Sequence, residues 1–144
     1  MTSDVLLAAV FTALTGDATM TSLLAPAGAD GVRRVRYARN LDLDASPVLA
    51  VDPALTVPGN APRSRITTIG FTAWVRADAT TVGDPMAVSV NIIKRVQTLF
   101  VLNPRSCNTP KGLLDSSNLP DQVTLPQGEF WQCNAVIRFN HSDD

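Results

Sequence analysis

Two long segments of alternating hydrophobic and polar residues are the clearest structural signal in this chain. One spans residues 66–77 and has an apolar side formed by Ile69, Phe71, Ala73 and Val75. The other spans residues 130–139 and has an apolar side formed by Trp131, Cys133, Ala135, Ile137 and Phe139. A period of two is typical of β-strands that bury one face. We therefore expect two strands that share one side of a sheet with the core.

A helix is predicted between these two strands. Gly83-Asp84-Pro85 combines an N-cap residue with proline at the first helical position, which is a strong start signal. Asn103-Pro104 marks the expected end. Helical spacing predicts a buried stripe made of Val90, Ile93, Val96, Gln97 and Phe100.

The N-terminal segment 5–14 predicts a helix that is apolar on nearly its whole circumference, with Asp4 as its cap. Leu7, Val10, Phe11 and Leu14 share one face, while Leu6, Ala9 and Ala13 share the opposite one. Such a helix is normally buried on more than one side. We expect Leu7 and Phe11 to face the domain's own sheet and Leu6 to contact another subunit.

The remaining pattern completes a single α+β domain over residues 1–144. Further strands are expected at 32–38, 47–51 and 122–125, and a short helix at 17–24. Proline- and glycine-rich loops are expected at 52–64 and 103–121, with a flexible tail at 140–144. The predicted fold is a mostly antiparallel sheet of four to five strands, packed with an N-terminal helix and one long central helix.

Composition argues for a surface that a partner covers in part. Hydrophobic residues make up 45% of the 144 residues, charged residues only 17%, and the net charge is -1. This balance gives no general attraction to nucleic acid or to an anionic membrane. The residues before position 5 include no basic one, and the apolar run of ten residues is too short to cross a bilayer. Cys107 and Cys133 are expected to be free thiols.

No catalytic, metal-binding or cofactor-binding pattern is present in the sequence. The single histidine, His141, lies in the predicted tail, and no serine lies in a nucleophile elbow. One histidine and two distant cysteines do not supply the four ligands of a structural zinc site. Asp42-x-Asp44-x-Ser46 resembles the start of a calcium loop, but Pro47 follows where that loop needs glycine. We expect a protein that is not an enzyme and that binds no cofactor.

Two features suggest contact surfaces, and each has a second interpretation. Arg33, Arg34, Arg36 and Arg39 form the basic cluster, which fits an acidic partner surface, a phosphate backbone or the solvated face of an edge strand. Trp74 lies on the less apolar side of the central strand, where it is either an interface anchor or a residue packed under a helix. The loop at 53–64, which carries Arg63, is expected to reach either a neighbouring subunit or the structure on which the subunits assemble.

The order of these elements resembles the tail terminator (tail completion, head-tail joining) proteins of long-tailed bacteriophages and gene transfer particles. An apolar N-terminal helix and a second short helix precede Val35-Arg36-Tyr37, and the strand Ser46–Val51 follows. After a long loop come Phe71-Thr72-Ala73-Trp74-Val75, the helix with Val90–Val96 and a late strand. The resemblance is one of pattern and covers nearly the whole chain.

The resemblance implies a structural virion protein that forms a six-membered ring. Such a ring caps the tail tube, ends its polymerisation and docks the tail to the head connector, so its partners are the tube protein and the connector or neck protein. DNA is only cargo passing through the lumen, and no membrane is involved. The implied location is the tail-neck junction of the virion, assembled in the host cytoplasm. The interface residues expected on this view are Leu6, Arg33, Arg34, Arg36, Arg63 and Trp74. Two alternatives stay open: a head-completion or neck connector protein, and a small-ligand-binding α+β domain.

Overall fold

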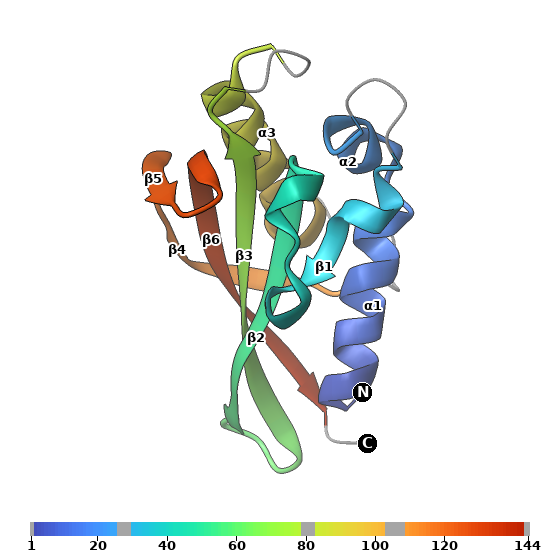
Figure 1. Ribbon diagram of the computed structural model, residues 1–144. Coiled ribbons are helices and arrows are strands. Elements are labelled where there is room, and N and C mark those ends of the chain that lie inside the picture. Colours follow the sequence, from blue (N-terminus) through green and yellow to red (C-terminus); the bar gives the residue numbers. More distant parts are fainter. Residues whose placement is uncertain (1, 26–29, 79–82, 103–108, 143–144) are drawn as a thin grey trace.

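A computed structural model describes residues 2–25, 30–78, 83–102 and 109–142, and a twisted, mostly antiparallel sheet is its centre (Figure 1). Within these residues the sheet has six strands in the order β1-β2-β3-β6-β4, and β5 pairs with another part of β6. Their bounds are β1 Val35–Tyr37, β2 Val48–Pro58, β3 Ser64–Arg76, β4 Gly112–Ser117, β5 Asp121–Leu125 and β6 Gly128–Ser142. Only the β1–β2 pair is parallel among these pairings. The predicted α+β class is confirmed, with more strands than the expected four to five.

Helices cover one side of this sheet. They are α1 Ser3–Thr15, α2 Ala18–Leu23 and α3 Pro85–Gln97, and a π-helical turn Thr98–Leu102 extends α3. Asp84 caps α3 through its side chain and Pro85 occupies the first turn, as predicted. Thr2, and not Asp4, caps α1, because its side chain accepts the bond from the Val5 amide. The cap therefore lies two residues earlier than the apolar pattern indicated.

The core lies between the helices and the inner side of the sheet. Ile69, Phe71, Ala73 and Val75 of β3 are all fully buried there, as the alternation predicted. The rings of Phe71, Phe100 and Phe139 join β3, the π-helical turn and β6, with centroids 5.8 and 5.7 Å apart. Aromatic pairs at this spacing add to the stability that burial provides. One connected cluster therefore joins the sheet to α1, α2 and α3.

The predicted orientation of α1 is wrong. Leu6 is 1% exposed and belongs to the core together with Val10 and Leu14, while Leu7 and Phe11 are only partly buried. Leu6 is therefore not available as an interface residue in the folded chain. The helix is apolar on nearly all sides. Hydrophobic spacing alone therefore did not show whether the face with Leu6 or the face with Leu7 is turned towards the core.

The buried stripe of α3 is partly as predicted: Ile93, Val96 and Phe100 are buried, but two other predicted members are not. The buried residues are Ser89, Ile92, Ile93 and Val96, whereas Val90 and Gln97 are half-buried at the sides. Ser89 fits inside because its hydroxyl donates to the Met86 carbonyl at 2.7 Å. A satisfied hydroxyl can occupy a core position that an apolar pattern does not recognise.

The segment predicted as a loop at 52–64 is mostly strand. β2 passes through Pro53 and continues to Pro58, with a bulge between Pro53 and Leu55, and only residues 59–63 form the turn. Proline is tolerated here because β1 pairs only with Leu49–Val51, which leaves this part of β2 at the edge of the sheet. In the view of Figure 1, the turn of the resulting β2–β3 hairpin lies at the bottom of the molecule, below both the N- and the C-terminus.

The C-terminal third is more regular than expected. The predicted loop at 103–121 contains β4, and its first part, residues 103–108 with Cys107, lies outside the described residues. The predicted flexible tail is ordered as far as Ser142, because residues 140–142 of β6 pair with Ser64–Ile66 of β3. β5 confirms the short strand predicted at 122–125. The strand expected at 32–38 is reduced to β1, with short 3-10 turns at Val32–Arg34, Ala38–Asn40 and Leu43–Ala45.

Candidate functional site

Among the described residues, five of the nine large hydrophobic side chains that are exposed lie on or beside the two free edges of the sheet. On the β2 side, Leu55 is 61% exposed and Val57 is also exposed. On the β4 side, Leu113 is 59% exposed, Leu114 is exposed, and Leu119 follows in the connection to β5. Single exposed leucines are ordinary, but their concentration on two unpaired edges is a recognised mark of strand-mediated contacts. These edges are the candidate functional site.

The β2–β3 hairpin is tied to the body by a chain of hydroxyl groups. Ser3 of α1 hydrogen-bonds Thr56 at 3.2 Å, Thr56 bonds Thr67 at 2.9 Å, and Thr67 bonds Nε2 of His141 at 2.6 Å. His141 is therefore a half-buried structural residue of β6, which corrects its assignment to a solvated tail. Thr67 is 1% exposed, so its hydroxyl is buried, while the half-buried His141 ring lines a shallow hollow beside Arg63 and Ser64. These three hydrogen bonds hold the part of the hairpin next to its turn against α1 and β6.

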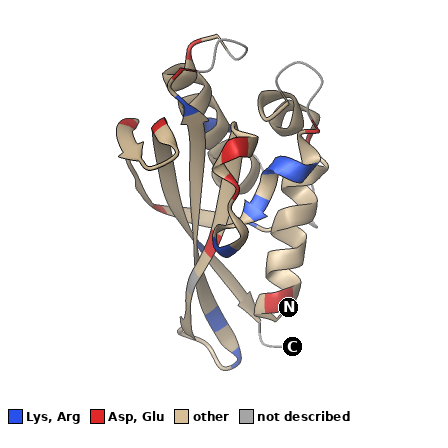
Figure 2. Ribbon diagram, viewed as in Figure 1, with Lys and Arg blue, Asp and Glu red and all other residues tan. Residues whose placement is uncertain are grey.

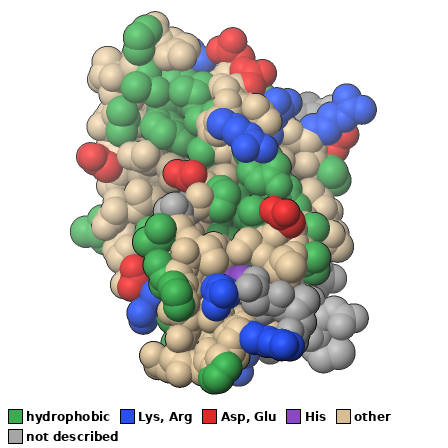
Figure 3. Space-filling model, turned by 90° about the horizontal axis from the view of Figure 1, so that it is seen from below, with side chains coloured by type: hydrophobic (Ala, Val, Ile, Leu, Met, Phe, Trp, Pro, Cys, Tyr) green, Lys and Arg blue, Asp and Glu red, His purple; other side chains and the backbone are tan. Residues whose placement is uncertain are grey.

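Arg63 lies at the exposed tip of the hairpin. It is a non-glycine residue with positive φ, 61°, in the turn between β2 and β3. Viewed from this end, the surface shows Lys and Arg side chains among separate hydrophobic groups (Figure 3). The predicted position of Arg63 on a projecting segment is consistent with this geometry, although the segment is a hairpin tip and not a long loop.

The predicted arginine cluster divides into a structural and a surface part. Arg34 is half-buried and donates to the carbonyls of Ala45 and Pro47, and burial together with the nearby Arg36 lowers its pKa. Arg33 is exposed and pairs with Asp30 at 3.3 Å. Among the interface residues predicted here, Arg34 therefore serves the fold, because it anchors the segment that crosses the outer side of β2.

Arg36 and Arg39 are the arginines of this cluster best placed for an external contact. Nε of Arg36 donates to the Arg33 carbonyl at 3.0 Å, and the guanidinium of Arg39 lies 4.9 Å from the centre of the Tyr37 ring. Tyr37 in turn contacts Phe11 of α1, with ring centroids 4.6 Å apart. Neither arginine is in an ion pair with a described carboxylate, so both keep charge available at the β1 edge.

Trp74 lies on the outer side of the sheet, away from α3, and is half-buried there. Its ring meets Phe130 edge-on, with centroids 6.2 Å apart, and the Arg76 guanidinium lies 5.2 Å from the Phe130 ring. The interpretation that Trp74 packs under a helix is wrong, since its contacts are with the sheet itself. Phe130 is fully buried on this outer side, whereas Trp131, which was expected in the core, is half-buried.

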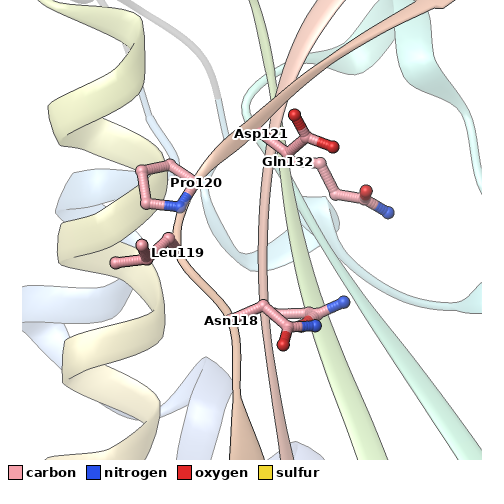
Figure 4. Close-up of a pocket in the computed structure, with 6 residues that line it drawn as sticks. Asn118, Leu119, Pro120, Asp121 and Gln132 are labelled. Atoms are coloured by element: carbon pink, nitrogen blue, oxygen red, sulfur yellow. The ribbon is translucent and has the colours of Figure 1, made fainter.

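A hollow of about 350 Å³ lies at the junction of β4, β5 and β6. It is lined by Asn118, Leu119, Pro120, Asp121, Gln132 and Asn134. Asn118 donates to the Asn134 side chain at 2.7 Å, which fixes both amides. Asp121, Gln132 and Asn118 extend to one side of the backbone and Leu119 to the other (Figure 4). The hollow therefore carries one carboxylate among amides, on the acidic edge of the sheet.

A buried ion pair was missed by the sequence analysis. Asp17 is 3% exposed, accepts from the Met20 amide as the N-cap of α2, and receives two bonds from Arg95 of α3 at 2.8 and 2.7 Å. The hydrogen bond to Asp17 raises the pKa of Arg95. An N-cap at Asp17 can be predicted from its position before a short helix. The ion pair with Arg95 cannot, because that residue is 78 positions later in the sequence. This pair joins two helices, with the Asp17 carboxylate buried and the Arg95 side chain partly exposed.

Cys133 is a free, buried thiol, as predicted. It donates to the Asn118 carbonyl at 3.5 Å, and burial raises its pKa. A raised pKa in the folded state stabilises the fold fully below the pKa of the unfolded thiol, and this contribution is lost as pH rises towards the folded value. In a Cys107→Ser background, urea unfolding should therefore show stability falling as pH rises above about 8.5, the ordinary pKa of a thiol.

The matched variant Cys133→Ala separates this thiol from other groups that titrate in the same range. It should lose part of the pH dependence while keeping the fold. Labelling of Cys133 by a thiol reagent should require unfolding. Rapid labelling of the native protein, or an unchanged pH dependence in Cys133→Ala, would contradict the assignment.

Within the described residues, no group of three or more His, Cys, Asp or Glu side chains is placed to hold a metal ion. In the same part of the chain, no helix combines the length and apolar character that crossing a bilayer requires. Comparison of the chain with models of known protein families and with curated protein sequences finds no match.

Proposed function

We propose that this protein is a structural virion component, a tail terminator that assembles as a six-membered ring on the end of a phage tail tube. The ring ends tube polymerisation and presents its other face to the head connector. The protein acts without catalysis or a cofactor, and DNA passes through the ring only as cargo. It is built into the tail-neck junction during assembly in the host cytoplasm.

The observation that carries this proposal is the pair of unpaired sheet edges beside a projecting hairpin. A subunit of a ring needs two different contact surfaces, because each copy meets one neighbour on each side. The described chain has two such edges, each with exposed apolar side chains, and a hairpin that extends past the body. The order of helices and strands on which the resemblance to tail terminators rests also supports the proposal, although strand β2 replaces most of the expected long loop.

The second candidate, a head-completion or neck connector, would use the same edges to form a ring on the portal instead of the tube. A small-ligand-binding domain is favoured only by the hollow beside Asp121. That hollow is open to solvent, and the Asn118 and Asn134 side chains that line it hydrogen-bond to each other. The geometry therefore favours an assembly role over a ligand site.

The test is to add the purified protein to tail tubes polymerising from the tube protein encoded in the same genome. Tube length, measured by electron microscopy, should decrease as the protein is added, and each finished tube should carry a ring-shaped density at one end. Native mass spectrometry should detect a ring-sized species in solution or released from the tubes. Binding to portal rings, with tube length unchanged, would favour the neck connector. A monomer or dimer that binds neither would overturn both assignments.

A further inference from the structure

The two free edges of the sheet lie at the same level along the strands. Leu55 pairs with Thr68, Thr68 with Arg138, and Arg138 with Leu113. These four residues form one row across the sheet, and directly paired residues project to the same side. Leu55 and Leu113 therefore end the same row on the same face, one at each edge.

The strand directions allow these edges to continue each other. β2, β3, β6 and β4 are each antiparallel to the next strand, so β4 runs opposite to β2. When a second copy is placed beside the first with its strands in the same orientation, β4 of one copy lies antiparallel to β2 of the next. Antiparallel pairing of edge strands satisfies main-chain groups that are otherwise left to water.

The available segment of β2 is short and defined at both ends. β1 covers β2 only at Leu49–Val51, and Pro53 and Pro58 offer no amide hydrogen. Residues 54–57 remain as the segment of β2 that can donate to a neighbour. β4 is similarly limited, because its bulge between Leu114 and Ser116 interrupts the ladder. These limits restrict the register, which an edge without prolines or a bulge would leave free.

Charge differs between the two edges. Residues 30–58, which form the β1–β2 edge, contain four arginines and four aspartates, but Asp30 pairs with Arg33 and Asp44 with Arg76, whereas Arg36 and Arg39 are in no ion pair with a described carboxylate. Residues 111–129, at the β4–β5 edge, contain Lys111 but also Asp115, Asp121 and Glu129. Figure 2 shows acidic residues on the β5–β6 hairpin and basic residues on and before β1, with further acidic residues on the segment between β1 and β2. Attraction between the edges therefore depends on Arg36 and Arg39 on one side and on the carboxylates of the β4–β5 edge on the other.

From these observations we infer that β4 of one copy of this chain docks antiparallel on residues 54–57 of β2 in the next copy, with Leu113 against Leu55. The partner is a second copy of the chain, and the contact joins two different edges. It places the acidic β4–β5 edge beside Arg36 and Arg39, which gives the arginine cluster its acidic partner. The inference rests on the self-assembly in the proposed function and names the surfaces that carry it.

The experiment is cysteine cross-linking between two single variants, Leu55→Cys and Leu113→Cys, each in a Cys107→Ser background. Facing residues of adjacent strands have Cα atoms about 4.5–5.5 Å apart, within the range that a disulfide spans. Mixing and mild oxidation should give a disulfide between positions 55 and 113 as the dominant product, identified by peptide mass spectrometry. The double variant should give a ladder of covalent oligomers on a non-reducing gel, and the ladder should disappear on reduction.

Met86→Cys is the matched control for Leu113→Cys, because Met86 is also exposed but lies in the first turn of α3, which packs on β3 and β6 in the middle of the sheet. Mixed with Leu55→Cys it should give no disulfide between positions 55 and 86. Dominant 55–55 disulfides would indicate a two-fold contact and overturn the inference, as would cross-links from Leu55→Cys to the tube protein alone. Rings that cap tubes without a 55–113 link would overturn this contact while leaving the proposed function intact. A 55–113 ladder in a protein that ignores tube ends would uphold the contact and overturn the function.

Discussion

Leu6→Asp is expected to unfold the domain and not merely to block its assembly. Leu6 is 1% exposed in the core beside Val10 and Leu14, so the carboxylate would be buried without a partner. Loss of the buried leucine together with an unpaired charge should cost roughly 4–5 kcal/mol, near the upper end for single substitutions. Many domains of this size have a total stability of about 5–15 kcal/mol. Circular dichroism and urea titration should show a largely unfolded or strongly destabilised protein.

Val5→Asp is the matched control, one residue earlier on the same helix. Val5 is 52% exposed, and a negative charge in the first turn of α1 is favourable to the helix dipole. This variant should retain the wild-type unfolding midpoint within a few tenths of a kcal/mol. If Leu6→Asp instead folds normally while assembly fails, α1 is oriented differently from the structure and Leu6 is an interface residue after all.

Asp17→Ala is expected to lower the free energy of unfolding by about 3–5 kcal/mol, the range found when one partner of a buried ion pair is removed. Two effects combine in this variant: α2 loses its N-cap bond to the Met20 amide, and Arg95 loses both of its bonds to a carboxylate. Arg95 is partly exposed, which lets water replace some of the lost interaction and favours the lower end of that range. Chemical denaturation followed by tryptophan fluorescence measures the change.

Asp17→Asn and Arg95→Met separate the two contributions. Asparagine keeps the N-cap acceptor but removes the charge, so it should be less damaging than alanine. Arg95→Met leaves Asp17 capping α2 and removes only the ion pair. Equal destabilisation by Asp17→Ala and Asp17→Asn would assign the effect to the charge, whereas a nearly neutral Asp17→Asn would assign it to the cap. Neither substitution touches the sheet edges, so any variant that still folds should still assemble.

The candidate contact surfaces were only partly predictable from the sequence. Arg36 and Arg63 were expected at the surface and are there, because charged side chains in short strands and turns have few other options. Leu55 and Leu113 were not found. Leu55 lies in a proline-rich stretch that reads as a loop, and Leu113 lies in Gly-Leu-Leu-Asp-Ser-Ser, which has no period of two. Their shared row depends on β3 and β6 standing between them, which is a long-range property.

Local patterns by themselves determined the elements whose information lies within one segment. The alternation in β3 and in most of β6 predicted which residues are buried, because one face of each strand packs against the core and the other faces outward. Asp84-Pro85 predicted the start of α3, because a cap and a proline act within one helical turn. Only the tertiary structure decided the rest. α1 offers two apolar faces, and the packing of α2 and the sheet selects Leu6 over Leu7. β4 is a strand because β6 supplies its partner, and residues 140–142 are ordered because the start of β3 extends far enough to pair with them. In each of these cases the deciding interaction joins residues far apart in the sequence, so no local pattern carries it.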